Sequence, residues 1–539
     1  MNDRMQAVGR GQGDELFDEE FDVVVVGYGY AGGTAAMEAA NAGAKVLLIE
    51  KNSVPGGISI CSYGAVRSAK SRDDAFAYLK TTNGGRTPDD VIRTLADGMA
   101  TMEAYVRKLA AVNGSNVRVN IEKSKGANYP LPGTDTFYHT WIDAIPNFDR
   151  RAAYPWANGA TDGQHLFKTL SDNVAKAGVE VRLSTSAQRL IADGRTREVM
   201  GLVISNSKGT SRIKARRGVI LATGGFEGNA NIRDQFWEGT PILPAAGRTN
   251  TGDGIRMAQD LGAQLWHMWH FHGSYGFKHP DPAYPYAIRV KRLPDWKPGR
   301  EDEADIQMAW ILLDKSGKRY MNEYQPYTQD TTQRQMHYFD PVTQSYPRNP
   351  SVFICDEKGR KMYALGRPTS NDEGIRMDWS ADNLKEIDMG ILKRADSLAE
   401  LADILGVDKV QMEKSIARWN AACAIRKDED HGRPGGTMMP IDTAPYYGAP
   451  VWCVCTNTQG GPVHDAQQRI IDAYGEAIPR LYAAGEMGSS FGHLYMSGGN
   501  IAECFVTGRV SGQGAAALPA WDEAHARTSR RAAQTAEVS

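Results

Sequence analysis

The stretch FDVVVVGYGYAGG at positions 21–33 decides the fold of this chain. Its valine run has the length and β-branched composition of a strand, and its lack of polar alternation is typical of a parallel strand buried on both faces. Gly27, Gly29 and Gly32 follow at GxGxxG spacing, and the Ala-rich segment after them has strong helix propensity. A second apolar run at 44–50 completes a β-α-β unit of about thirty residues, which predicts a dinucleotide site.

Each glycine of this turn has a separate task. Gly27 permits the tight turn, Gly29 lets a pyrophosphate approach the backbone, and Gly32 lets the helix pack close to the strand. The positive N-terminus of the helix then faces the phosphates. Glu50 ends the second strand, where a carboxylate can accept hydrogen bonds from ribose hydroxyls.

Further glycine clusters indicate which of the two common dinucleotides, a nicotinamide dinucleotide or FAD, the site would bind. Gly56 and Gly57 follow the carboxylate closely, and the segments 222–225 (ATGG) and 481–486 (LYAAGE) end two more strand-like runs in small residues. A nicotinamide dinucleotide does not require these close approaches, whereas a flavin must be enclosed along its pyrophosphate, ribitol and ring system. The sequence therefore predicts FAD, which we expect to be held non-covalently.

Length, charge and cysteine usage set outer limits on the protein. A chain of 539 residues predicts two or more domains, and a formal net charge of -2 gives no field that favours nucleic acid. No run approaches the roughly 18 apolar residues that span a bilayer, and the first twenty residues show no signal-peptide pattern. Six cysteines without a CxxC pair indicate free thiols in a reducing compartment. We expect a cytoplasmic protein without a nucleic-acid partner or a transmembrane segment.

Several short motifs, taken together, make the chain resemble the flavoproteins that group soluble fumarate reductases with 3-ketosteroid dehydrogenases. The resemblance covers most of residues 20–515. Besides the glycine turn, the motifs that carry it are PGG at 55–57, ATGGF at 222–226, NTGDG at 250–254, GKRYMNE at 317–323, IPRLYAAGE at 478–486 and SGGN at 497–500.

The resemblance implies an α/β fold in two parts. A Rossmann-like FAD-binding domain is expected to be discontinuous, at 20–272 and 440–517, with an inserted α+β capping domain at 273–439. Substrate is expected to lie between the cap and the flavin. A disordered tail at 1–20 and a polar tail at 518–539 complete the expected organisation.

The same resemblance assigns roles around the cofactor. Glu486 is expected to hydrogen-bond the ribitol, and Asp253 to support the flavin site. The helix that begins near Asn500 would direct its positive end at the pyrimidine edge of the flavin, where the reduced form carries negative charge. The complete set of predicted cofactor residues is Gly27, Gly29, Ala31, Gly32, Glu50, Lys51, Gly57, Ser59, Thr223, Gly224, Asp253, Gly485, Glu486, Asn500 and Ile501.

The two branches of this resemblance differ in the residues that hold the substrate. Fumarate reductases grip two carboxylates, so they need cationic and histidine donors. In this chain Met496 stands where their motif before the last helix has Arg, and Tyr327 replaces the Arg that follows their Asn-Glu pair. The segment 457–461 (NTQGG) also lacks their histidine. A dicarboxylate site is therefore disfavoured.

The ketosteroid dehydrogenase pattern matches at two places. These are GHLY at 492–495, with Gly499 four residues on, and NEYQPY at 322–327. The resemblance implies that the Tyr495 hydroxyl and the Gly499 N–H bind a substrate carbonyl and that Tyr327 removes the α-proton. The adjacent carbon then loses hydride to flavin N5, which leaves a C=C bond beside the ketone.

A tyrosine base needs help from its neighbours. Its reference pKa lies near 10, so its phenolate must be stabilised before it can accept a proton. By the resemblance, a second tyrosine is expected to assist, and the sequence leaves Tyr138 and Tyr129 as candidates. Ser497 is a further candidate, as a partner of Tyr495 in a proton relay.

Arg360 leaves a second function open. The segment FICDEKGR at 353–360 resembles the fumarate reductase stretch with a proton-donating Arg, so Arg360 is either the acid in reduction of an activated alkene or part of a surface turn. A FAD protein that only carries electrons is a third reading, against which a tailored cap argues. His267 and His270 lack a matching Cys or carboxylate cluster, so no metal site is predicted.

The predicted partners follow from the dehydrogenase reading. The substrate is expected to be a small apolar ketone, either steroid-like or alicyclic. The chain has no haem-attachment CxxCH motif, so a separate electron acceptor is expected.

Overall fold

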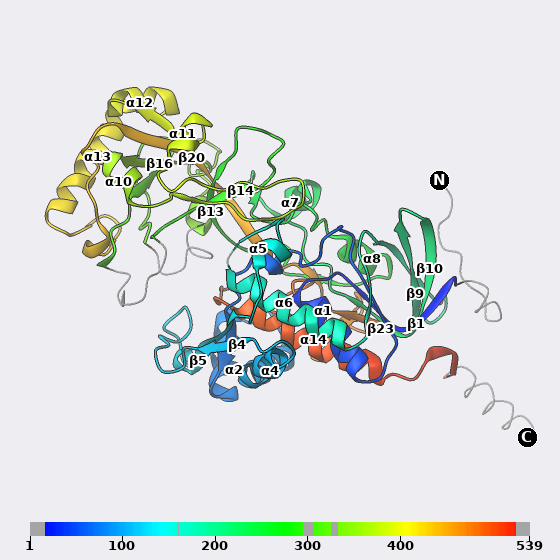
Figure 1. Ribbon diagram of the computed structural model, residues 1–539. Coiled ribbons are helices and arrows are strands. Elements are labelled where there is room, and N and C mark those ends of the chain that lie inside the picture. Colours follow the sequence, from blue (N-terminus) through cyan, green and yellow to red (C-terminus); the bar gives the residue numbers. More distant parts are fainter. Residues whose placement is uncertain (1–16, 160, 295–304, 325–332, 524–539) are drawn as a thin grey trace, which may run out of the picture.

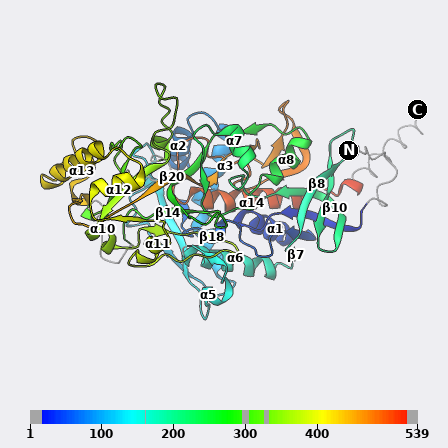
Figure 2. The same cartoon turned by 90° about the horizontal axis from the view of Figure 1, so that it is seen from above.

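The computed structural model describes residues 17–159, 161–294, 305–324 and 333–523. Two large sheets lie toward opposite ends of an elongated molecule, with a smaller helical part beside the first (Figures 1 and 2). None of the described helices is long and apolar enough to cross a membrane.

The first sheet contains the predicted β-α-β unit. Its strand order is β22-β23-β10-β1-β2-β7, and the neighbours from β23 to β7 pair in parallel. The first half of β10 also pairs antiparallel with β9, and β9 with β8. The strands are β1 (Glu19–Val26), β2 (Val46–Ile49), β7 (Glu180–Arg182), β8 (Ser186–Ala192), β9 (Val199–Asn206), β10 (Gly209–Leu221), β22 (Arg469–Ile471) and β23 (Ala477–Ala483).

The two faces of β1 pack into different apolar clusters. Val23 and Val25 join one cluster, Val24 and Val26 join the other, and none is more than 6% exposed. Successive side chains of a strand point to opposite faces, so the sheet is covered on both sides, as the unbroken valine run predicts. The first cluster contains side chains of α1 (Tyr30–Asn41), α6 (Thr161–Lys176) and α14 (Gly499–Ala517). The predicted α/β fold class is confirmed.

The helices α1 and α14 pack directly against each other, although they come from opposite ends of the chain (Figure 1). Gly508 and Gly512 allow this approach, because an added Cβ would lie 2.7 Å from Ala31 O and 2.4 Å from Ala35 O, respectively. The site near the start of α1 is therefore built from both ends of the sequence.

The second sheet forms the cap. Its order is β15-β16-β20-β13-β14-β17, and the pairs along this path are antiparallel. Two further strands, β11 and β19, also pair with β20. The strands are β11 (Leu243–Pro244), β13 (Phe271–Lys278), β14 (Ala287–Val290), β15 (Trp310–Leu313), β16 (Ser351–Asp356), β17 (Gly366–Arg367), β19 (Lys393–Ala395) and β20 (Tyr446–Thr458). The helices α10 (Glu357–Met362), α11 (Leu384–Asp388), α12 (Leu398–Leu405) and α13 (Lys409–Ala424) accompany this sheet (Figure 1).

A third, smaller part combines helices with a three-stranded sheet of order β3-β5-β4. Its elements are β3 (Val66–Ala69), α2 (Arg72–Asn83), α3 (Asp89–Ala100), α4 (Met102–Ala110), β4 (Asn116–Val119) and β5 (Phe137–Ala144). Shorter elements elsewhere are α5 (Arg150–Ala153), β6 (Ala157–Asn158), α7 (Ala230–Phe236), α8 (Asp253–Asp260), β12 (Leu265–Trp266), α9 (Gln333–Met336), β18 (Ser370–Asn371) and β21 (Gly461–Pro462).

The secondary structure crosses several of the expected boundaries. β20 reaches Thr458 as part of the cap sheet, beyond the expected return to the first domain at 440. β1 begins at Glu19, inside the expected tail. At 518–523, the last residues that the structure describes, the chain is still packed, because Trp521 is 5% exposed and Asp522 lies 3.2 Å from Lys214 Nζ. A strand that continues past a domain boundary, or an ion pair that holds a terminal segment, does not change the local amino-acid composition. The sequence therefore does not mark these boundaries.

Candidate active site

The glycine turn closes tightly against the end of β10. Gly27 has φ of +104°, and an added Cβ there would lie 2.3 Å from Ala222 O. An added Cβ on Gly32 would lie 1.8 Å from Gly27 O. The turn therefore has no room for side chains at these two positions, and its backbone stays open toward a ligand.

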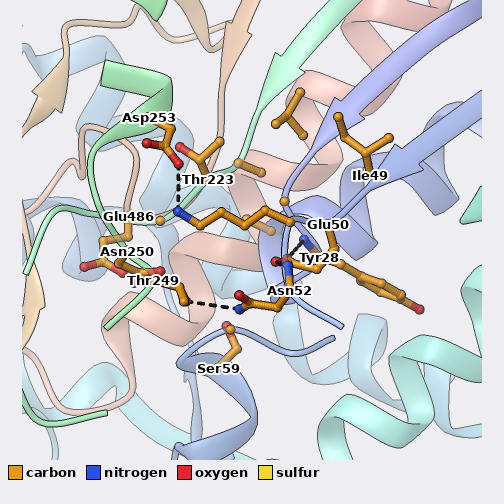
Figure 3. A pocket seen from close by; sticks show the side chains of 18 of the residues that line it. Tyr28, Ile49, Glu50, Asn52, Ser59, Thr223, Thr249, Asn250, Asp253 and Glu486 are labelled. Carbon is orange, nitrogen blue, oxygen red and sulfur yellow. Dashed lines mark hydrogen bonds and ion pairs between the residues drawn. The ribbon is translucent and has the colours of Figure 1, made fainter. Parts of the chain in front are cut away.

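Glu50 lies beside this turn at the end of β2. Its carboxylate accepts hydrogen bonds from the backbone N–H groups of Tyr28 and Asn52, each at 2.9 Å (Figure 3). Burial raises the pKa of Glu50, and the two N–H groups and the nearby Lys51 oppose that shift. The carboxylate is thus oriented by the backbone before any ligand is bound.

Two side-chain contacts fasten the end of β2 to the segment that begins α8. Lys51 Nζ lies 2.7 Å from an Asp253 carboxylate oxygen, and Asn52 Nδ2 donates to Thr249 Oγ1 at 3.0 Å (Figure 3). These contacts join residues about two hundred positions apart along the chain. They make one wall of a cavity in front of the glycine turn.

This first cavity brings together most of the predicted cofactor residues. It starts at the N-terminus of α1 and runs along the ends of β1, β2 and β10. The predicted residues that line it are Gly27, Gly29, Ala31, Glu50, Lys51, Gly57, Ser59, Thr223, Gly224, Asp253 and Glu486.

A second cavity, of about 520 Å³, continues from the first toward the cap. The two cavities share the lining residues Tyr30, Ile58, Ser59, Glu486 and Cys504. The second is also lined by the predicted residues Tyr495, Ser497, Asn500 and Ile501.

Tyr495 lies beside a polar network at the start of α14. Its ring centroid is 4.7 Å from that of His272, at an angle of 78°. His272 Nδ1 lies 3.1 Å from Asn500 Oδ1, and Asn500 Nδ2 donates to Gln459 Oε1 at 3.1 Å. Tyr495 and the N-terminal residues of α14 therefore line the same cavity.

Other predicted site residues do not line either cavity. Gly32 and Gly485 support packing, because a Cβ on Gly485 would lie 2.7 Å from the Ala31 Cβ. The Gly499 N–H donates to Met496 O at 2.8 Å, so in this structure it is engaged within the chain. Tyr327 lies outside the described residues.

Tyr138 and Arg360 are held at positions away from the lining of the cavities. Tyr138 is 5% exposed and donates to Glu103 at 2.9 Å, and burial raises its pKa. A phenolate at this position is disfavoured, and the other candidate, Tyr129, also does not line the second cavity. Arg360 is 6% exposed, so it is not part of a surface turn; it forms two 2.7 Å contacts to the Glu357 carboxylate.

Several lining residues were absent from the sequence predictions. Asn52, Thr249 and Asn250 line the first cavity, and Arg289 and Arg292 line the second. Asn250 belongs to the NTGDG motif, which offered a signal. Arg289 lies in strand β14 and Arg292 lies two residues after its end, and nothing in that sequence pattern distinguishes them from surface residues.

Three buried carboxyl groups lie near the junction of the cavities. Burial raises the pKa of Glu486 to about 7, although Thr458 N–H donates to it at 2.7 Å. Burial and the charge of Glu486 raise the pKa of Glu227. Burial also raises the pKa of Glu503 to about 7, against donation from Ser489 Oγ at 2.7 Å. This region therefore favours neutral carboxylic acids when no ligand is bound.

Glu503 gives a pH-dependent prediction for the ligand-free protein. Its carboxyl pKa of 4.5 in the unfolded chain rises to about 7 on folding, so its stabilising contribution is complete below pH 4.5 and is lost as the pH rises through 7. Between about pH 5 and 8, the unfolding free energy of the wild type should fall by about 3 kcal/mol relative to that of Glu503→Gln. Denaturant unfolding at several pH values measures this, and parallel curves for the two proteins would contradict it.

The residues present fit FAD. The N-terminus of α1 faces the first cavity and that of α14 faces the second, so one extended ligand can place its phosphates at one helix and its ring system at the other. Gly57 lines the first cavity with φ of +49°, and an added Cβ there would meet no atom within 4 Å. The two cavities share five lining residues, so one extended dinucleotide can occupy both.

Comparisons with known proteins agree with this fit. The FAD binding domain family matches residues 22–501. A fumarate reductase (cytochrome) of Shewanella frigidimarina is 27% identical over 519 residues, which cover 92% of this chain and 77% of that protein. A 3-oxosteroid 1-dehydrogenase of Mycolicibacterium smegmatis is 26% identical over 588 residues, which cover 93% of this chain and 98% of that protein.

A solved structure shows the same fold. The crystal structure of 3-ketosteroid delta1-dehydrogenase from Sterolibacterium denitrificans superimposes with a TM-score of 0.77 at 23% identity, covering 93% of this chain and 100% of that one. The match to the family extends from the first strand of the glycine turn to the first turn of α14. The chain belongs to the FAD binding domain family and is an FAD-dependent oxidoreductase related to the fumarate reductases and the 3-ketosteroid dehydrogenases.

Proposed function

We propose that this flavoprotein is a dehydrogenase that introduces a C=C bond beside a ring ketone. The observation that carries the proposal is the position of Tyr495 in the second cavity, which opens directly into the cofactor-binding first cavity. Non-covalently bound FAD supplies a hydride acceptor, and a separate acceptor takes the electrons. The relatives named as 3-ketosteroid and 3-oxosteroid dehydrogenases support a cyclic ketone as the substrate class.

Tyr495 is the proposed donor to the substrate carbonyl. Loss of an α-proton develops negative charge on the carbonyl oxygen, and a preorganised O–H donor stabilises that charge. The Gly499 N–H already donates to Met496 O, so Tyr495 is assigned the main part of this stabilisation. Ser497, in the same wall, is the proposed relay partner.

Tyr327 remains the proposed base, on the family pattern alone, since it lies outside the described residues. It is the only part of the proposed machinery that rests on the sequence without a structural position. Neither Tyr138 nor Tyr129 lines the second cavity, so the proposal assigns neither a part in catalysis.

The alternative of alkene reduction with Arg360 as the acid has less support. Arg360 is fixed by Glu357 and by the carbonyl oxygen of Asp382, at 2.6 Å, and the side-chain bond to Glu357 raises its pKa. An arginine held in this way inside the cap does not reach the second cavity. Reduction of an alkene would need a different proton donor.

Anaerobic spectroscopy tests the proposal. The purified yellow protein is titrated with saturated 3-ketosteroids and with simple cyclohexanones while the absorbance of oxidised flavin is followed. A dehydrogenase is expected to lose that absorbance stoichiometrically as the ketone becomes an enone. If no ketone has this effect, while an enone or unsaturated acid reoxidises the dithionite-reduced protein, the enzyme is a reductase. A protein that responds to neither is an electron carrier.

A further inference from the structure

The cap strand β14 places a basic side chain at the second cavity. Alternate residues of a strand share a face, so Arg289 lies on the same face as Ala287 and on the opposite face from Ile288. Ala287 packs into the cluster that contains α1 and α14, whereas Ile288 packs into the other cluster. Arg289 thus faces the first domain, and it lines the second cavity together with Arg292.

The backbone of Arg289 pairs with β13 and β17, but its side chain forms no hydrogen bond or ion pair with any residue that the structure describes. Burial lowers the pKa of Arg289, and the nearby Tyr495 opposes that shift. Two other buried arginines of the cap are satisfied, because Arg319 and Arg433 lie 2.9 and 3.3 Å from the Glu323 carboxylate. The Arg289 side chain is half-buried at the cavity, and a guanidinium partly withdrawn from water is more favourable with an anion beside it.

The surroundings of Arg289 add positive potential. Arg292 lies over the Tyr324 ring, 4.7 Å from its centroid, and borders the same cavity. Cationic groups around a cavity raise the local concentration of anions.

We propose that Arg289 binds a carboxylate carried by the substrate, which makes the substrate a ring ketone with one acid group. The inference rests on the proposed function for its ketone end, where Tyr495 binds the carbonyl oxygen. It concerns the other end of the same molecule. A guanidinium presents parallel N–H groups that match a carboxylate, and Tyr495 lines the same cavity as Arg289. A substrate with both functions on one small ring satisfies both residues.

The test compares an acid with its neutral amide on the oxidised holoenzyme. Cyclohexanecarboxylate and cyclohexanecarboxamide, which contain no ketone, are titrated first, and binding is followed by the change in the flavin spectrum. Cyclohexanones that bear a carboxylate or an amide are then titrated anaerobically. The wild type should bind each acid about 100-fold more tightly than the matching amide, as a buried Arg–carboxylate pair requires.

The preference for the acid should disappear in Arg289→Gln and be partly kept in Arg289→Lys. Arg394→Gln is the charge-matched control, because the Arg394 side chain is exposed on cap strand β19 and pairs with Asp396 at 2.7 Å; it should keep the full preference. Substrate-free Arg289→Gln should melt no lower than the wild type, since it loses a half-buried charge whose side chain has no partner among the described residues. A purely structural arginine would instead lower the melting temperature.

The outcomes separate this inference from the proposed function. Equal binding of acid and amide by the wild type overturns the carboxylate site, even when ketones bleach the flavin. A strong preference for the acid that depends on Arg289, without bleaching by any ketone, supports the carboxylate site and removes the dehydrogenase proposal. If Arg289→Gln does not fold, the wild-type comparison and Arg289→Lys still decide.

Discussion

Tyr495→Phe is expected to lower the rate at which a ketone reduces the bound flavin by about 10²- to 10³-fold. This is the effect of removing one preorganised donor to a developing oxyanion, worth roughly 3–4 kcal/mol in the transition state. The substitution removes one oxygen atom and keeps the ring, so the contact with His272 at 4.7 Å is retained. Stopped-flow absorbance of the flavin at saturating ketone measures the rate directly.

Tyr138→Phe is the matched comparison for this experiment. The two substitutions are chemically identical, but Tyr138 lies outside the lining of the second cavity and donates to Glu103. Its loss should lower stability by about 1 kcal/mol and leave the rate of flavin reduction nearly unchanged. An equal loss of rate in both variants, or a normal rate in Tyr495→Phe, contradicts the assignment. Flavin content is measured in both proteins, so that a loss of cofactor is not mistaken for a loss of catalysis.

The flavin-binding half of the site could be predicted from the sequence because the residues that form it are close together along the chain. Strand, turn and helix follow one another within positions 21–42, and the apolar run, the glycine spacing and the helix propensity all specify the same structure. The carboxylate of Glu50 is fixed by its own neighbours Tyr28 and Asn52. The positions of residues within such a unit are fixed by neighbouring residues rather than by contacts with distant parts of the chain.

The substrate-binding half was harder to predict because contacts between residues far apart in the sequence bring it together. Tyr138 and Arg360 were selected by short motifs, and the carboxylates that hold them, Glu103 and Glu357, could not be inferred as partners. Arg289 was missed for the converse reason. Whether a strand arginine faces solvent or a cavity depends on how the cap sheet docks, which the sequence of β14 does not contain.

Gly27→Ala is expected to produce a protein that purifies without its yellow colour. A residue with a side chain is strained at φ of +104°, and the new Cβ would lie 2.3 Å from Ala222 O, a backbone atom at the end of a buried strand. Relief requires β1 and β10 to separate where they hold the dinucleotide. Overpacking of this kind costs about 3 kcal/mol, so affinity for FAD should fall by about 100-fold or more. Flavin per polypeptide is measured from the visible and ultraviolet absorbance of the purified protein.

Gly43→Ala separates backbone strain from collision. Gly43 also has a left-handed φ, of +88°, but an added Cβ there would meet no atom within 4 Å. It follows α1, outside the residues that line the first cavity. This variant should lose about 1 kcal/mol of stability from strain and keep its full complement of FAD. If Gly27→Ala binds FAD as well as Gly43→Ala does, contact between the turn and β10 does not control cofactor binding. If only Gly27→Ala is colourless, the close approach of these two segments is what the glycine preserves.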